Sequence, residues 1–407
     1  MTMPVQTTYQ RMPSSASLPA LAPKDPSQRT AIVDMLRGWA LLSVVLVNYA
    51  IFYSYDAVIR VPAYDVISRA LKIVISVVFV SKGWTLLSLL FGYGFSALME
   101  KRRGGDPQPR WLFWKRMFWL FVIAIMNSGI YYGDVLKDYV LMGLLISLFD
   151  RASKKTFLTM AIICLLAFPA LIPISRSLHV RMPAINPSLS LYTSHNPVDV
   201  LRFGLESGLH VLLSFPKYFD WNLVMLTCGF VGAYLQKSAF FERLKEDTRL
   251  LKRSFWCSAL AVIALPLIHW GSDALRWNVD RLYDAYTWFE LSLMVFFASG
   301  LCWIFLRSKA NFFFVSLQYV GRMTLTNYLS QNLVAMLLFS GFGLGLLHKT
   351  SYSFNIGTAL SVFIVQVFFS RWWLSLHKWG PCEWLWRSLT YGSWISNEIP
   401  TAWNVQK

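Results

Sequence analysis

The stretch AIVDMLRGWALLSVVLVNYAIFY, residues 31–53, decides the class of fold. It is a long apolar run whose only charged side chains, Asp34 and Arg37, lie near its start. A helix of about 20 apolar residues is long enough to cross the hydrocarbon core of a bilayer. The sequence therefore predicts a transmembrane helix here.

Further apolar runs of this kind fill most of the chain, and together they predict about ten membrane crossings. The second run is too long for one span, so we expect Lys82-Gly83 to divide it into an interfacial piece and a membrane helix. The predicted fold class is all-α, a polytopic transmembrane helical bundle. The predicted spans are 31–53, 66–98, 111–132, 134–150, 156–174, 218–240, 254–270, 286–306, 322–347 and 355–376.

The composition supports lipid as the surrounding medium. The chain has 407 residues, of which 56% are hydrophobic and 14% charged, whereas soluble domains have about 25% charged residues. The net charge of +17 would also suit a nucleic-acid partner. However, the basic residues form short clusters between apolar runs, which is typical of membrane topology, so we expect no nucleic acid as partner.

Every second connection between predicted spans is basic. Because cytoplasmic connections carry an excess of Lys and Arg, this alternation predicts that both termini of a multi-pass membrane protein are cytoplasmic. The residues that carry the charge are Lys101, Arg102, Arg103, Arg110, Lys115, Arg116, Arg151, Lys154, Lys155, Lys237, Arg243, Lys245, Arg249, Lys252, Arg253, Arg307, Lys309, Arg322, Lys378 and Arg387.

The chain divides into five parts. Residues 1–29 are polar and rich in Pro and Ser, which predicts a disordered cytoplasmic tail and not a signal peptide. Residues 30–174 form an N-terminal transmembrane half, 175–217 an outward-facing loop, 218–392 a C-terminal transmembrane half and 393–407 a tail. The five cysteines form no CxxC pair, so neither disulfides nor a bound metal are expected.

Ionisable and strongly polar groups within apolar spans mark candidate functional residues, since they are costly in lipid. Asp34 and Arg37 share a helix face, either as a structural ion pair or as an anion site with Arg37 facing a phosphate or carboxylate. Asn48 lies eleven residues beyond Arg37. It is either a hydrogen-bonding group between helices or part of a site.

Two other segments carry candidates. Asp134 is expected to cap the helix after a tight turn, or to lie in the outer mouth of a cavity, with Tyr139 close behind. Polar residues also form a stripe on the ninth predicted span, which serves either as contact between helices or as a substrate-lining surface. The stripe consists of Thr324, Asn327 and Gln331, with Tyr328 adjacent.

Glu290 lies inside the eighth predicted span and must be either paired or protonated, but the sequence does not show its partner. The histidines are at no metal-ligand spacing, and the chain has no HExxH, GxSxG or P-loop motif. A lone histidine near a helix end is more often a surface residue. A base for group transfer would nevertheless be supplied most readily by a histidine, so His210, His269 and His348 are candidates.

Several motifs together resemble the YeiB family, whose C-terminal part is the domain of unknown function number 418. The resemblance covers about residues 30–392. It implies acyltransferase-like motifs in the N-terminal half and the YeiB signature in the C-terminal half. The motifs are DMLRGWA with the following residues to Asn48, FGYG at 91–94, GDVL at 133–136, GRMTLTNYLSQ at 321–331 and GPCEWLWRSLTYG at 380–392.

The first span of that family is similar to membrane acyltransferases of the acyltransferase-3 type and of the heparan glucosaminide acetyltransferase group. Acyltransferase-3 enzymes place a catalytic histidine where this sequence has Asn48, whereas the acetyltransferase group has Asn there and its reactive histidine further on. Many YeiB relatives also carry a histidine just before the GDxL turn. Here that region reads Met126-Asn127-Ser128, so the resemblance leaves the base unassigned.

The leading hypothesis is a membrane acyltransferase-like protein. Acyl-CoA would act as co-substrate near Arg37 and the basic loops, and the unknown acceptor, a small or lipid-linked molecule, would bind near Asp134. The alternatives are a transporter of a polar or lipid-linked solute and a non-catalytic membrane partner; the oligomeric state is left open. We expect Arg37, Asn48, Asp134 and Asn327 to converge on one polar cavity.

Overall fold

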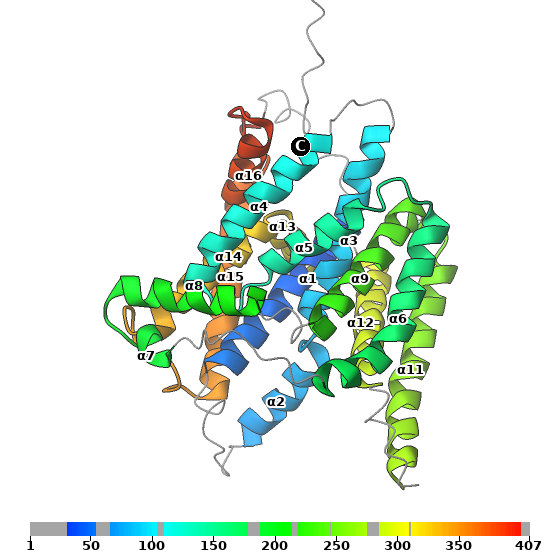
Figure 1. The fold of residues 1–407 in the computed structure, drawn as a ribbon, viewed down its shortest axis with the longest axis horizontal. Coiled ribbons are helices and arrows are strands. Elements are labelled where there is room, and N and C mark those ends of the chain that lie inside the picture. Colours follow the sequence, from blue (N-terminus) through cyan, green and yellow to red (C-terminus); the bar gives the residue numbers. More distant parts are fainter. Residues whose placement is uncertain are drawn as a thin grey trace, which may run out of the picture.

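The computed structural model describes residues 31–53, 66–103, 110–177, 188–213, 219–244, 246–274, 285–308 and 311–399. Within these ranges the regular structure is helical, apart from one isolated bridge between His377 and Glu398 (Figure 1). The prediction of an all-α fold is confirmed. The predicted tail 1–29 and the last residues of the C-terminal tail lie outside the described ranges.

The helices in chain order are α1 Ala31–Val47, η2 Asn48–Phe52, α2 Val66–Val78, α3 Lys82–Arg103, α4 Arg110–Ile130, α5 Leu136–Ser147, α6 Lys154–Ser177, α7 Leu189–Tyr192, α8 Pro197–Leu213, α9 Phe219–Lys237, α10 Phe240–Arg243, α11 Arg249–Ala274, α12 Tyr286–Arg307, α13 Phe312–Arg322, α14 Thr324–Phe339, α15 Tyr352–Leu376 and α16 Pro381–Tyr391. The element η2 is a π-helix that continues α1 without interruption.

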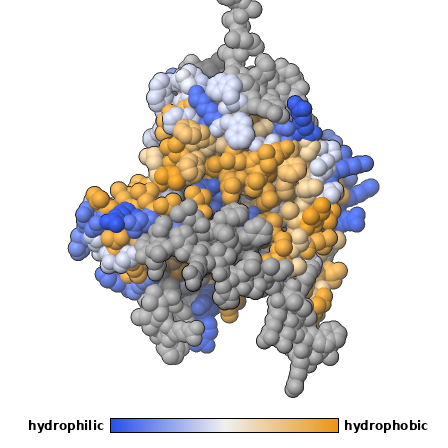
Figure 2. Space-filling model, viewed as in Figure 1, coloured by the Kyte–Doolittle hydropathy of each residue, from blue (hydrophilic) through white to orange (hydrophobic). Residues whose placement is uncertain are grey.

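Six segments of the described chain are long and apolar enough to cross a membrane: Ala31–Phe52, Ile67–Glu100, Lys154–Leu171, Arg249–Gly271, Tyr286–Arg307 and Tyr352–Leu376. Figure 2 shows hydrophobic side chains across the middle of one face, with hydrophilic ones gathered towards its upper end and margins. Both observations support a multi-pass membrane protein.

The first helix is the centre of the bundle. Of the most apolar 18-residue window in Ala31–Phe52, 72% is buried, against 6% for the window in α11. Helix α1 packs against α3, α13, α14 and α15. The outer helix α11 instead exposes large apolar side chains, including Trp256, Leu260 and Ile263, which are suited to contact with lipid.

The division of the second apolar run is confirmed. Helix α2 ends at Val78 and α3 begins at Lys82. Between them Ser81 has φ +66°, in the left-handed region that a helix cannot continue through. The chain therefore changes direction directly before Lys82.

Other predicted bounds differ from the structure. Helix α5 has 12 residues, about 18 Å at 1.5 Å per residue, which is shorter than the hydrocarbon core of about 30 Å. The ninth predicted span, 322–347, contains α14, which stops at Phe339 because the chain turns at Ser340 to Gly345. The basic connection before it contains α13, and the predicted outer loop contains α7 and α8.

Helix α13 lies close to α1 because each helix has a glycine where it meets the backbone of the other. A Cβ atom at Gly38 would collide with the carbonyl oxygen of Leu317, and one at Gly321 with the carbonyl oxygen of Asp34. The two helices can approach this closely only where side chains are absent. This contact fixes the start of α1, with Asp34 and Arg37, against the end of α13.

We expect Gly38→Ala to lower stability by about 1–3 kcal/mol, because the methyl group would force α1 and α13 apart. The measurement is thermal unfolding of the purified protein in detergent. Gly357→Ala in α15 is the matched control, since a Cβ there meets nothing within 4 Å. Equal melting temperatures for the two variants would show that the close contact does not limit stability.

Candidate functional site

The turn between α4 and α5 places Asp134 among three helices. The carboxylate is 2% exposed and accepts hydrogen bonds from the side chains of Asn127 (2.6 Å) and Tyr328 (3.2 Å). Ser128 Oγ donates to its other oxygen at 3.4 Å. The predicted capping position belongs to Val135 instead, which is the N-cap of α5. The Asp134 carboxylate is therefore a group of the protein interior.

Helix α14 completes the set of contacts. Asn332 Nδ2 donates to Asn127 Oδ1 at 3.2 Å, and the Val135 backbone amide donates to Tyr328 Oη at 3.4 Å. Tyr328 and Asn332 are four residues apart and so lie on one face of α14. We call Asp134, Asn127, Ser128, Tyr328 and Asn332 the Asp134 cluster.

A buried cation lies beside this cluster. Lys137, which is 4% exposed, follows Asp134 by three residues, and its Nζ donates to the Asp134 backbone carbonyl. This contact is with the carbonyl oxygen; the attraction between an ammonium and a carboxylate three residues apart nevertheless reduces the cost of burying both in a medium of low dielectric constant. The cluster thus places a buried carboxylate beside a buried lysine side chain.

The polar stripe on α14, Thr324, Asn327 and Gln331, contacts more than one neighbouring helix. Asn327 Nδ2 donates to the carbonyl of Val320 (3.1 Å) and to Ser370 Oγ on α15 (2.9 Å). Gln331 is fully buried, and neither atom of its side-chain amide has a partner among the described residues. The stripe therefore continues the polar surface of α14 from the Asp134 cluster towards α13 and α15.

Gln366 on α15 extends that polar surface. Its Nε2 donates to the Asn327 carbonyl (2.7 Å) and to Ser330 Oγ (3.0 Å). Its Oε1 and the Oδ1 of Asn327 are buried without a hydrogen-bond donor from the described chain. Orphaned buried amide oxygens call for water or a polar ligand as partner.

The start of α1 carries a pair of charged side chains. Arg37 Nη1 lies 3.1 Å from Asp34 Oδ1, and the two side chains are 27% and 5% exposed. The predicted ion pair is therefore present. Asn48, at the other end of the same helix, is the first residue of η2 and is half-buried.

Two further predicted residues make backbone contacts. Thr324 Oγ1 donates to the Gly321 carbonyl at 2.6 Å, across the break between α13 and α14. Tyr139 Oη donates to the Trp84 carbonyl at 3.3 Å and its ring stacks on Phe91. In the structure both side chains join neighbouring elements.

The three candidate histidines lie on separate elements. His269 is exposed on α11. His348 follows α14 in a turn with φ +54°, and partial burial lowers its pKa from the ordinary value. His210 is on α8, the helix that packs on Ser128 through Gly208. At about 100° per residue, His210 lies about 200° round the helix from Gly208 and so on a different face.

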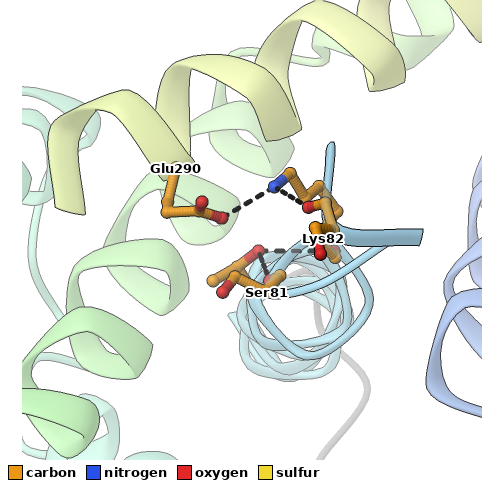
Figure 3. Close-up of polar contacts among 5 residues, drawn as sticks. Ser81, Lys82 and Glu290 are labelled. Carbon is orange, nitrogen blue, oxygen red and sulfur yellow. Dashed lines mark hydrogen bonds and ion pairs between the residues drawn. The ribbon is translucent and has the colours of Figure 1, made fainter. Parts of the chain in front are cut away.

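A second buried charged group lies at the start of α3. Lys82 Nζ is 2.7 Å from Glu290 Oε2 on α12, and the two side chains are 0% and 9% exposed. Figure 3 shows the two groups pointing towards each other beside Ser81. Lys82 Nζ also donates to the Ser76 carbonyl at 3.3 Å. This contact supplies the partner of Glu290 that the sequence does not reveal.

The N-terminus of α14 is held by a carboxylate from α16. Glu383 Oε1 accepts from the backbone amides of Leu325 (2.6 Å) and Thr326 (3.2 Å), and its Oε2 accepts from Thr326 Oγ1 at 2.6 Å. An anion at this end of a helix interacts favourably with the helix dipole. Helix α16 therefore positions the helix that carries Tyr328.

We expect Glu383→Ala to lower stability by about 1.5–3 kcal/mol, because charge-assisted hydrogen bonds to α14 are lost. Thermal unfolding in detergent measures the effect. Glu246→Ala, at an exposed site, is the control and should leave the melting temperature unchanged. An unaffected Glu383→Ala protein would mean that α14 does not depend on this cap.

Of the residues in the Asp134 cluster, the sequence indicated Asp134 and Tyr328 as candidates, but not Asn127, Ser128 or Asn332. The sequence could have indicated Asn332, because this residue follows Tyr328 by four positions and so extends the polar stripe on the same helix. To predict the contacts of Asn127 and Ser128 with Asp134, one would need to know the turn that folds α5 back beside α4. Among the described residues, no group of three or more His, Cys, Asp or Glu side chains could hold a metal ion.

These features define a helical, multi-pass membrane protein with a polar cluster in its interior. Residues 235–393 match the family model described as "Protein of unknown function (DUF418)". The chain therefore carries this domain, and the resemblance read from its motifs is confirmed. The matched region contains α14 and α16 but not Asp134.

Relatives extend the similarity over most of the chain. "Uncharacterized protein YxaH" of Bacillus subtilis (strain 168) is 26% identical, covering 92% of this chain and 97% of its own. "Uncharacterized protein YeiB" of Escherichia coli (strain K12) is 28% identical, covering 89% and 96%. An "Uncharacterized 39.9 kDa protein in amylase 3'region" of Bacillus acidopullulyticus is 24% identical, covering 89% and 94%.

Proposed function

We propose that this protein is a membrane-embedded acyltransferase-like enzyme that uses Asp134 as a proton acceptor. The observation that carries the proposal is the Asp134 cluster, a buried carboxylate held by neutral donors from α4 and α14 beside the ammonium of Lys137. Acyl transfer needs a base for the acceptor and a positive charge for the oxyanion. Asp134, in the turn before α5, and Lys137, in its first turn, would supply them.

The transfer step follows from these groups. An acceptor hydroxyl or amine attacks the thioester carbonyl of acyl-CoA and passes its proton to the Asp134 carboxylate. The new bond to the acyl carbon forms while the carbon–sulfur bond breaks, and the CoA thiolate leaves. Lys137 would stabilise the negative charge that develops on the carbonyl oxygen. The proton on Asp134 then returns to solvent or to the thiolate.

The topology in this proposal has about ten transmembrane helices, both termini in the cytoplasm and a location in the bacterial inner membrane. The orientation rests on the alternation of basic connections, the number of helices on the apolar runs, and the location on the similarity to YeiB of Escherichia coli. The CoA phosphates would meet the basic surface that includes Arg37, since a guanidinium suits phosphate geometry. The acyl acceptor would approach Asp134 from the other side of the membrane.

The test is transfer of label from radioactive acetyl-CoA to membrane extract by the purified protein. We expect labelled product with the wild-type protein and a large loss with Arg37→Ala. Asp247→Asn, at an exposed loop position, should match the wild type. Absence of both acetyl-CoA binding and transfer would refute the proposal.

A second candidate function is transport of a polar or lipid-linked solute. The orphaned amide atoms of Asn327, Gln331 and Gln366 favour it, because they offer hydrogen bonds to a passing polar group. Solute uptake by proteoliposomes without any acyl donor distinguishes the two functions. Uptake abolished by Gln331→Leu, with no acyl transfer, would support transport.

A further inference from the structure

Two lines of hydrogen bonds end on one oxygen of Asp134. Asn127 Nδ2 donates to Asp134 Oδ1 at 2.6 Å, and Tyr328 Oη donates to the same oxygen at 3.2 Å. Asn127 and Tyr328 each have an accepting atom as well as a donating one. The group that occupies each accepting atom determines whether the donor must face Asp134.

The backbone fixes the direction of the Tyr328 hydroxyl. The Val135 amide donates to Tyr328 Oη at 3.4 Å, and a peptide N–H group can donate but cannot accept. The hydroxyl oxygen therefore uses a lone pair towards Val135. Its proton is left for the carboxylate of Asp134.

Asn332 fixes the direction of the Asn127 amide. The Nδ2 atom of Asn332 donates to Asn127 Oδ1 at 3.2 Å, and the Asn332 side chain is buried on α14. If the Asn127 amide turned over, two NH₂ groups would face each other, and the Asp134 carboxylate would face an oxygen. The donor of Asn332 therefore keeps the NH₂ group of Asn127 directed at Asp134.

The other oxygen of Asp134 has a neighbour that can reverse its role. Ser128 Oγ lies 3.4 Å from Asp134 Oδ2, and a hydroxyl can either donate or accept. A proton on Oδ2 finds an acceptor when the Ser128 hydroxyl rotates, whereas a proton on Oδ1 would meet two donors. This arrangement makes Oδ1 an acceptor and leaves Oδ2 to take up a proton.

The charged groups beside Asp134 act in opposite directions. Lys137 on α5 favours the ionised carboxylate, and the neighbouring Asp138 opposes it. Helix α4 contributes the neutral side chains of the cluster, and α8 meets Ser128 through Gly208. Other titratable groups that interact with Asp134 are the hydroxyls of Tyr131, Tyr139 and Tyr328. The aligned neutral donors therefore bear directly on the charge of Asp134.

We propose that Asn332 is a positioning residue for Asp134: by fixing the Asn127 amide it holds the carboxylate ionised, with Oδ2 as the atom that accepts a proton. The inference rests on the proposed function only for the source of that proton, the hydroxyl or amine of the acyl acceptor. The O–H or N–H bond of the acceptor breaks as the Oδ2–H bond forms, and its electron pair stays on the acceptor. The charge of Asp134 itself is measurable without any transfer.

The test is infrared spectroscopy of the purified protein in detergent, titrated from neutral to acidic pH. Subtraction of the Asp134→Asn spectrum identifies the carboxylic-acid band of Asp134. We expect the protonated fraction, compared at equal pH, to rise about tenfold in Asn127→Leu, which removes a hydrogen bond to the charged group. A rise of about threefold or more is expected in Asn332→Leu, which leaves that bond possible but no longer aligned.

Two further variants separate positioning from a general loosening of the bundle. Because Asn332 acts through Asn127, the double variant N127L/N332L should match Asn127→Leu. The control is Asn355→Leu, which should leave the protonated fraction unchanged. Asn355 is fully buried in α15 and accepts a hydrogen bond from Thr350 at 2.7 Å, outside the Asp134 cluster. If Asn332→Leu does not fold, Asn332→Ala removes the same donor without added bulk and is measured in its place.

A second readout depends on acyl transfer. As the pH falls, Asn332→Leu should lose activity at a higher pH than the wild type, because Asp134 becomes protonated sooner. The KM for acetyl-CoA should stay the same. Absence of transfer by the wild type would refute the proposed function, and the infrared result would still decide the role of Asn332.

Three infrared results would overturn the inference: a wild-type protonated fraction in Asn332→Leu, an equal rise in Asn355→Leu, or a larger rise in the double variant than in Asn127→Leu. The first would mean that Asn332 does not affect the charge of Asp134. The second would assign the effect to loosened packing. The third would mean that Asn332 acts on Asp134 by a route other than Asn127.

Discussion

Glu290→Gln is expected to destabilise the protein by about 3–5 kcal/mol, because it leaves the ammonium of Lys82 buried without its counter-ion. Lys82 is fully buried, and Glu290 Oε2 is 2.7 Å from its Nζ. The glutamine amide can accept a hydrogen bond but cannot balance the charge. Thermal unfolding in detergent, followed by tryptophan fluorescence, measures the loss.

Two further variants test whether the loss of stability comes from breaking the buried ion pair. The double variant K82M/E290L should regain most of the lost stability, since apolar residues of similar volume can replace a buried ion pair. Glu206→Gln, which breaks the exposed pair with Arg202, should leave the melting temperature almost unchanged. If Glu290→Gln melted with the wild type, the pair would not be what joins α3 to α12.

Asp134→Asn is expected to reduce acyl transfer by about 10²–10⁴-fold, the usual contribution of a positioned acid–base group. The asparagine has nearly the shape of aspartate and retains an oxygen for Tyr328 and Asn127. It cannot take up the acceptor's proton. Initial rates with labelled acetyl-CoA measure the loss, and thermal unfolding shows whether the fold is retained.

The comparison variant is Asp134→Leu, which removes every hydrogen bond to the cluster. It should lower both stability and transfer, because Asn127 and Tyr328 lose a buried acceptor. Transfer at the wild-type rate by a stable Asp134→Asn protein would exclude Asp134 as the proton acceptor. The polar cluster would then have only a structural role.

The helical class and the break before Lys82 could be predicted because they depend on local pattern. A long apolar run interrupted by Lys82-Gly83 carries its own signal. The partner of Glu290 could not be predicted, because Lys82 is more than 200 positions earlier in the chain. The sequence does not reveal which helices pack together. Long-range pairing of this kind depends on the whole bundle.

The candidate site was predictable to a similar extent. Asp134 and Tyr328 stand out as polar groups in apolar surroundings, but their mutual contact joins α14 to a turn nearly two hundred residues away. Whether Arg37, Asn48, Asp134 and Asn327 share one cavity stays a prediction. The structure brings Asp134 to Tyr328 and directs the Asn327 amide to Val320 and Ser370.

The π-helix at Asn48–Phe52 bears on how this chain should be aligned with its relatives. A π-bulge amounts to one extra residue in an otherwise continuous helix, and each added residue turns the following side chains by about 100°. A relative with a plain α-helix here would carry the counterpart of Tyr53 one position earlier. An alignment that allows a single-residue gap near Asn48 would then pair Tyr53 with the residue at the same place in the relative's structure. In this protein the Tyr53 ring stacks on Phe339.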